Sequence, residues 1–137
     1  MLMPAAVLIV ILLGSIAVDF AIAFLGEREA LSLASAAAND AATAALDQDR
    51  FRTTGEFTLD HDRARRVVEA TLAASSSELH DVTVDVSFPV IDGTEGVRVE
   101  ITGTVDYVFA KAIPGAPDGI EVEASATAVA RVGSGAP

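Results

Sequence analysis

The sequence has no cysteine and no tryptophan, and aromatic residues fill only 5% of its 137 positions. Without cysteine the chain has no disulfides, no thiolate metal ligands and no cysteine nucleophile. A folded domain in this chain must therefore be stabilised by packing alone. The apolar fraction is nevertheless 51%, mostly Ala and Val, a composition that favours Ala-rich helices and Val-rich strands.

Basic residues are also scarce, since nine Lys and Arg stand against twenty Asp and Glu and leave a net charge of −11. A chain this acidic does not suit nucleic acid or anionic lipid headgroups, because Lys and Arg are needed to neutralise phosphate. We therefore expect no nucleic-acid partner. The acidity indicates either the solubility of an exposed domain or a surface that meets a basic partner or binds Ca²⁺.

Recognisable catalytic motifs are lacking too: the sequence has no Gly-rich phosphate loop, no nucleophile elbow and no HExxH pattern. His61 and His80 are poorly placed to cooperate. Asp60-His61-Asp62 looks like a metal or acid–base cluster, but consecutive residues on a helix point apart, so we interpret these carboxylates as helix caps. We expect no catalytic residue, no metal site and no cofactor, and hence no enzyme.

One long apolar run is present, from Pro4 to Leu25, which reads PAAVLIVILLGSIAVDFAIAFL. As a helix its 22 residues span about 33 Å, close to the hydrocarbon thickness of a bilayer. We predict a transmembrane anchor over residues 1–25, crossing the cell membrane once. The alternative is a cleaved signal peptide, with Ala21-Ile22-Ala23 as the cleavage motif. The run is long for a signal peptide, and no basic residue precedes Arg28.

Asp19 is the single charge within the apolar run. A carboxylate in hydrocarbon costs a few kcal/mol, so its presence needs an explanation. Asp19 either lies near the outer interface with its carboxylate among the headgroups, or makes a buried contact with another membrane helix or an assembly factor.

Helix propensity continues beyond the anchor, because EREALSLASAAANDAATAAL (residues 27–46) contains no Gly or Pro. We predict an Ala-rich helical extension over residues 26–47. Small side chains allow close approach of a second element. The preferred interpretation is that this helix packs on the sheet of its own chain.

The remainder predicts an α+β domain over residues 48–132, with a tail at residues 133–137 that has no reason to be ordered. A polar stretch from Asp47 to Gly55 ends the long helix, and a second, amphipathic helix begins near Asp60 or Asp62. Three strands with apolar residues at every second position predict an antiparallel meander with one wet face. The apolar positions of helix and strands are Ala64, Val67, Val68, Leu72, Ser75 and Leu79; Val82, Val84, Val86 and Phe88; Val97, Val99, Ile101, Val105, Tyr107 and Phe109; Ile120, Val122, Ala124, Ala126, Ala128, Ala130 and Val132.

Turns are predicted at Asp92-Gly93, Pro114-Gly115 and Asp118-Gly119. The charged run from Asp60 to Arg65 fits an exported domain better than a cytoplasmic tail, so we place the C-terminal domain on the extracytoplasmic side. We expect residues from about Asp47 onward to fold alone as a soluble acidic monomer.

The first 46 residues resemble the N-terminal module of TadE/TadG-like proteins of Flp (tight-adherence) pilus assembly. The shared features are an apolar span opening with Pro4, Ala17-Val18-Asp19 near its end, the charged stretch Glu27-Arg28-Glu29, and an Ala-rich helix with Asn39-Asp40. The order of elements downstream is also similar to that family. The resemblance implies a pilin-like layout.

The resemblance further implies a membrane-anchored accessory protein of pilus assembly or a related secretion system, with a structural rather than catalytic role. Its partners would be the lipid bilayer and other pilin-like or pilus-assembly membrane proteins, met through the N-terminal helix. Asp19, Asn39 and Asp40 are then the candidates for helix packing and assembly. The alternative function is a small anchored or secreted extracytoplasmic binding module, whose wet strand face holds a ligand or Ca²⁺.

Overall fold

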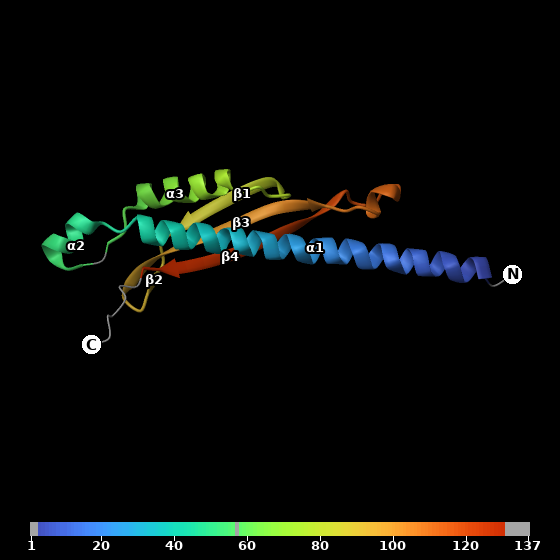
Figure 1. Ribbon diagram of the computed structural model, residues 1–137, viewed down its shortest axis with the longest axis horizontal. Coiled ribbons are helices and arrows are strands. Elements are labelled where there is room, and N and C mark those ends of the chain that lie inside the picture. Colours follow the sequence, from blue (N-terminus) through green and yellow to red (C-terminus); the bar gives the residue numbers. More distant parts are fainter. Residues whose placement is uncertain (1–2, 57, 131–137) are drawn as a thin grey trace.

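The computed structural model describes residues 3–56 and 58–130, and it has the predicted α+β composition (Figure 1). The helices and strands, in chain order, are α1 (Met3–Ala44), α2 (Gln48–Thr54), α3 (His61–Ala74), β1 (His80–Ser87), β2 (Val90–Ile91), β3 (Thr94–Asp106), the 3₁₀ turn η1 (Ala110–Ala112) and β4 (Gly119–Val129). The predicted tail, residues 133–137, lies outside the described residues, as does Val132 of the predicted last strand.

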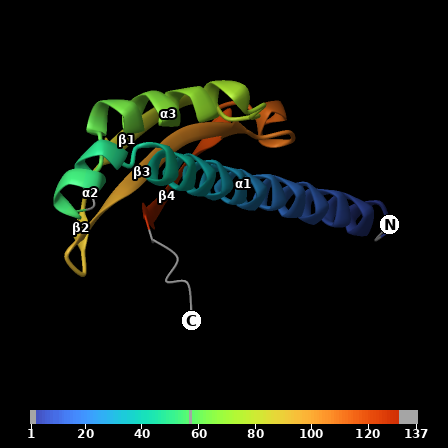
Figure 2. The same cartoon turned by 60° about the vertical axis from the view of Figure 1, so that its left-hand side comes forward.

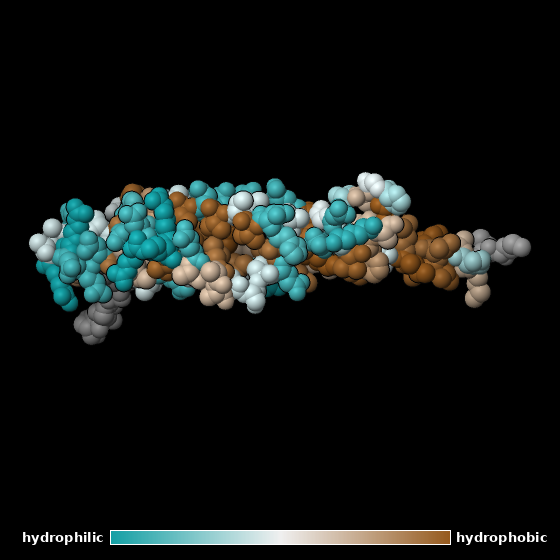
Figure 3. All heavy atoms as spheres, turned by 90° about the horizontal axis from the view of Figure 1, so that it is seen from above, coloured by the Kyte–Doolittle hydropathy of each residue, from teal (hydrophilic) through white to brown (hydrophobic). Residues whose placement is uncertain are grey.

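Helix α1 is continuous over 42 residues and has two different halves. The half nearest the N-terminus extends past the sheet (Figure 1) and exposes apolar side chains along its length (Figure 3). This half is long and apolar enough to span a membrane. The other half buries small residues at helical spacing, namely Gly26, Ala30, Ala34, Ala37, Ala38, Ala41 and Ala42.

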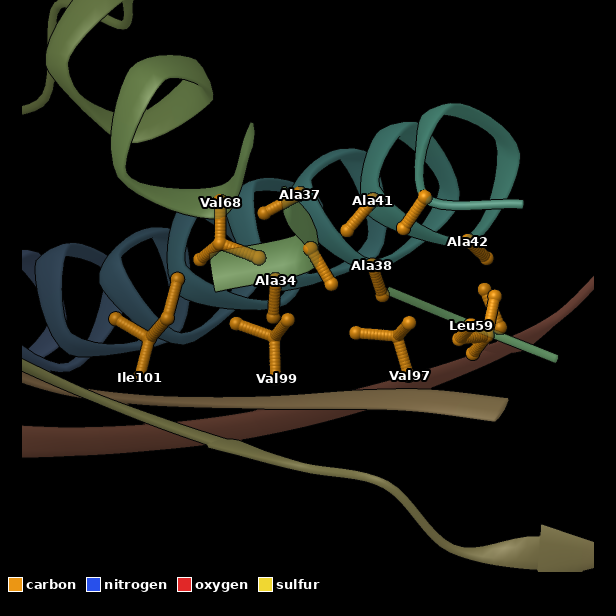
Figure 4. Close-up of a cluster of buried hydrophobic side chains, with 13 residues drawn as sticks. Ala34, Ala37, Ala38, Ala41, Ala42, Leu59, Val68, Val97, Val99 and Ile101 are labelled. Carbon is orange, nitrogen blue, oxygen red and sulfur yellow. The ribbon is translucent and has the colours of Figure 1, made fainter. Parts of the chain in front are cut away.

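These small residues pack against the sheet of the same chain, as predicted from their size. The alanines of α1 point at Val97, Val99 and Ile101 of β3, with Val68 of α3 beside them (Figure 4). Helix and sheet also approach closely at Gly26, because a Cβ at this position would collide with the side chain of Val105. A stripe of small residues thus lets helix and sheet come together with little space between them.

The sheet is an antiparallel meander in which β3 pairs with β1 on one side and with β4 on the other. The short strand β2 was not predicted. It continues β1 in the same register along β3, since Ser87 faces Arg98 and Val90 faces Glu95. Pro89 separates the two strands because it has no N–H for the ladder.

The hairpin between β2 and β3 turns at the predicted Asp92-Gly93 pair, where both residues have positive φ (51° and 79°). Two such residues define the tight turn that matches the twist of the flanking strands. The predicted inward and outward faces of β3 are confirmed, since Val97, Val99 and Ile101 are fully buried. Helices α1 and α3 cover this face, and the opposite face is open to solvent.

Three local expectations were wrong, and one short helix was not predicted. Val82 and Val84 of β1, predicted to face the core, are 43% and 40% exposed. The polar stretch after α1 forms the short helix α2, which Asp47 caps by accepting a hydrogen bond from the N–H of Arg50 and which Gly55 ends in the left-handed region. Helix α3 begins as predicted, with Asp60 as its cap, but ends at Ala74, so Leu79 is buried from the loop before β1. Strand β3 ends at Asp106 rather than at Phe109.

The hydrophobic core does not respect the predicted boundary between residues 47 and 48. The predicted extension, residues 26–47, and the predicted domain, residues 48–132, share one hydrophobic core, since six alanines of this region pack with Leu59, Val68 and the valines of β3. A fragment that begins at Asp47 lacks one wall of this core. We therefore revise the expectation that it folds alone, and take residues 26–130 as the smallest unit with a complete core.

Candidate functional site

Asp19 lies on α1 where its bare apolar half meets the domain, and its carboxylate binds the chain's own backbone. Oδ1 accepts hydrogen bonds from the N–H groups of Val108 and Phe109, both at 3.1 Å, and Oδ2 accepts one from Ala110 at 3.0 Å. Three consecutive N–H groups directed at one point form a concave anion site. The carboxylate is thus half-buried and partnered by three charge-assisted hydrogen bonds.

The loop that supplies these donors connects β3 to β4. Beyond Asp106 the chain leaves the sheet, and the N–H of Tyr107 donates to the carbonyl of Asp118 at 2.9 Å, which closes the base of the loop. Within it lie η1 and a turn at the predicted Pro114-Gly115 pair, where Gly115 has φ of 85°. Loop and helix meet through segments about 90 residues apart in the sequence.

A cleft of about 380 Å³ lies between this loop and α1. Its size is within the range of small-molecule pockets, but its lining is almost wholly apolar. The charged group in it, Asp19, is already bound by the loop N–H groups. The cleft therefore presents few polar groups to orient a polar ligand. Its lining residues are Leu12, Ser15, Ile16, Asp19, Phe20, Ala23, Tyr107, Phe109, Ala110, Ala112, Ile113 and Ile120.

Asp40 has a different role from Asp19, because its Oδ2 accepts a hydrogen bond from the hydroxyl of Thr71 at 3.1 Å. This bond joins α1 to α3 on the outside of the core. Asn39 is exposed, and its amide donates to the carbonyl of Ser35 within the same helix. Twenty residues of helix, about 30 Å, separate Asp19 from Asn39. The structure does not bring the three candidates together.

The Asp60-His61-Asp62 stretch behaves as the capping interpretation predicts, because Asp60 accepts a hydrogen bond from the N–H of Arg63 at 3.0 Å. His61 turns instead toward the β2–β3 hairpin, where its Nε2 lies 2.7 Å from Oε1 of Glu95 and its ring stacks on Phe88 at 3.9 Å. Within residues 3–56 and 58–130, no three His, Asp or Glu side chains are grouped as metal ligands. The stretch fastens α3 to the hairpin.

The loop also contains the chain's single lysine. Lys111 donates a hydrogen bond to Oδ2 of Asp106 at 2.7 Å. This bond lowers the pKa of the Asp106 carboxyl below its usual value of 3.8, and the Lys111 charge adds to the effect. The ion pair joins the start of the loop to its 3₁₀ turn, and both of its side chains are about half-exposed.

Sequence reasoning singled out Asp19 but missed its partner. The available signal was composition, because Val108, Phe109 and Ile113 are apolar residues that continue past the end of a strand into turn-forming sequence. We interpreted Phe109 as a strand residue and left Val108 and Ile113 unassigned. Spacing along the chain cannot reveal a contact between a helix and a loop about 90 residues later.

Comparisons with protein-family models, with curated proteins and with solved structures find no match to this chain.

Proposed function

We propose that the chain is a membrane-anchored, pilin-like accessory protein of Flp (tight-adherence) pilus assembly or a related secretion system. The anchor is the apolar half of α1, and the domain lies on the extracytoplasmic side of the cell membrane. The role is structural, through contacts of the N-terminal helix with other pilin-like or assembly proteins.

The observation behind this proposal is the division of α1. One unbroken helix exposes apolar side chains over its first half, where the β3–β4 loop contacts it through Asp19, and forms a wall of the domain core over its second half. Such a helix fixes the position of the domain relative to the bilayer, because both halves belong to one continuous series of backbone hydrogen bonds. The N-terminal resemblance to TadE/TadG-like proteins supplies the pilus context.

The contacts of Asp19 favour a retained anchor over a cleaved signal peptide. Cleavage after Ala23 would remove Asp19, and the N–H groups of Val108, Phe109 and Ala110 would lose their acceptor. It would also remove the α1 side of the apolar cleft. A signal peptide has no role in the mature fold, whereas this segment completes it.

Crosslinking along the anchor tests the proposed partners. Since the chain has no cysteine, single cysteines at successive positions from Leu8 to Val18 can be examined in membranes that also contain the assembly proteins. We expect crosslinks to another membrane protein that recur every three to four residues, as one face of a helix packs on its partner.

Val90→Cys is the matched control, because Val90 is equally apolar and exposed but lies in the β2–β3 hairpin. It should give no such crosslink. Crosslinks without helical periodicity, or none at any anchor position, would contradict the assembly role. A secretion ATPase and polytopic membrane proteins encoded beside this gene would support it.

A further inference from the structure

The β3–β4 loop exposes apolar side chains beside the bare half of α1. Val108 is 60% exposed and Ile113 56% exposed. Both belong to the loop that is fixed to Asp19, so they extend the apolar surface of the helix rather than forming a separate patch. A contiguous apolar surface of this kind marks a site of contact with a membrane or another protein.

The position of the loop along α1 favours the membrane over another protein as the contact. The cleft that Ile113 lines extends along α1 from Leu12 to Ala23, and all of these helix residues fall within the predicted span. The loop thus lies alongside the part of the span nearest the domain.

Insertion of the apolar half of α1 into a bilayer also inserts the loop that is bound to it. The apolar run from Pro4 to Leu25 spans about 33 Å as a helix, close to the hydrocarbon thickness of a bilayer. A helix that enters as far as Leu25 therefore takes the loop with it.

Most N–H groups of the loop have an acceptor, which suits an environment where an unsatisfied N–H is costly. Asp19 accepts three of its N–H groups, and carbonyls within the loop accept others. Pro114 and Pro117 have no N–H to satisfy. The partnered N–H groups are those of Tyr107, Val108, Phe109, Ala110, Ala112, Ile113 and Ala116.

We propose that Val108–Ile113 form a membrane foot, a second contact with the bilayer beside the α1 anchor. The foot enters the leaflet nearest the domain, where its one charged side chain, Lys111, stays paired with Asp106. Acyl chains of that leaflet fill the cleft between the foot and α1. Asp19 serves both partners, because its carboxylate satisfies the loop N–H groups and they in turn compensate its charge. The inference rests on the proposed membrane anchoring.

The test measures depth in the full chain reconstituted in phosphatidylcholine vesicles. Three single-cysteine variants, Ile113→Cys, Leu8→Cys and Ile91→Cys, receive the same environment-sensitive fluorophore. Quenching is measured with nitroxide-labelled phosphatidylcholine from the lipid side and with iodide from the water side. Ile91 is the matched control, since it is also an exposed isoleucine but lies in the β2–β3 hairpin.

We expect the labels at positions 113 and 8 to be quenched by the lipid nitroxide and protected from iodide, and the label at 91 to show the opposite. In the Asp19→Ala background the label at 113 should lose lipid quenching while the label at 8 keeps it. If the label at 113 is quenched by iodide like that at 91, while position 8 is lipid-quenched, the foot is wrong and the anchor stands. Iodide quenching at position 8 would overturn the anchor, and the foot with it.

Discussion

At Asp19, a carboxylate in an apolar helix accepts three hydrogen bonds from consecutive N–H groups of a loop about 90 residues away. The sequence predicted that this residue needs a partner, from the cost of a charge among apolar residues. The loop that binds Asp19 could not be predicted. It binds through backbone N–H groups, which nearly every residue type has, so the sequence of the loop does not identify it as the partner. The hypothesis that Asp19 also contacts another membrane helix stays a prediction.

Asp19→Ala should loosen the β3–β4 loop. The substitution removes the acceptor of three N–H groups, and hydrogen bonds to a charged group contribute about 1.5–3 kcal/mol each, with sums that are not additive. We expect hydrogen exchange at Val108, Phe109 and Ala110 to accelerate by one to two orders of magnitude, about 1.4 kcal/mol per factor of ten. Asp19→Asn, which keeps one carbonyl oxygen, should be intermediate; unchanged exchange in both variants would show that the contact is not made in solution.

Gly26 is the second residue on which the arrangement depends, because a side chain there meets Val105 of β3. Gly26→Val should separate helix from sheet and lower the free energy of unfolding by about 1–3 kcal/mol, as overpacking does. Gly14→Val is the matched control on the same helix, since no described atom lies within 4 Å of a Cβ placed there. Thermal unfolding in detergent compares the two, and equal melting temperatures would contradict the close approach at Gly26.

Among the elements, the strands were the easiest to predict and the connections the hardest. Alternation with period two gave the buried face of β3 because one face meets α1 and the other meets water. It could not give the end of β3, since Tyr107, Val108 and Phe109 are as apolar as strand residues. Leu79 was assigned to a helix face by spacing, yet the chain leaves α3 at Ala74.

Helix α2 could have been predicted from its capping residues. Asp47 before it and Gly55 after it are the residues that favour a helix start and a helix end. Its seven residues present no buried apolar face, so hydrophobic periodicity offered nothing to detect. Capping residues predict short exposed helices better than apolar spacing does.

Val99→Asp tests the inner face of the sheet. Val99 is fully buried opposite the alanines of α1, so the substitution places an unpaired charge in the core and should cost several kcal/mol. Thr127→Asp is the control, because Thr127 lies on the open face opposite Arg98 and should leave stability nearly unchanged. Urea unfolding measures both, and a Val99→Asp variant as stable as the parent would reverse our assignment of the two faces.

At the scale of the whole molecule, α1 has an apolar half long enough to span a membrane and a second half that forms a wall of the core, along which α3 and the sheet gather (Figure 2). The sequence indicated a helix of this length from apolar and Ala-rich composition. It did not indicate where the domain begins, because alanine is equally suited to an exposed helix and to a tightly packed one. Burial at Ala34, Ala37 and Ala41 resolves that point.

Two fragments test the shared core. Residues 26–130 retain the alanines that pack on β3 and should unfold cooperatively as an acidic α+β unit. Residues 47–130 expose the face of β3 that α1 covers, and should lack a cooperative transition by circular dichroism and calorimetry. A cooperative transition in the shorter fragment, with the stability of the longer one, would show that the Ala-rich half of α1 is dispensable.

Retention of the apolar half of α1 in the membrane is the central claim, and mass spectrometry of the mature protein after alkaline carbonate extraction tests it most directly. We predict that the protein stays in the membrane pellet and that its intact mass includes residues 4–25. A soluble protein whose first residue lies near Phe24 would contradict the claim.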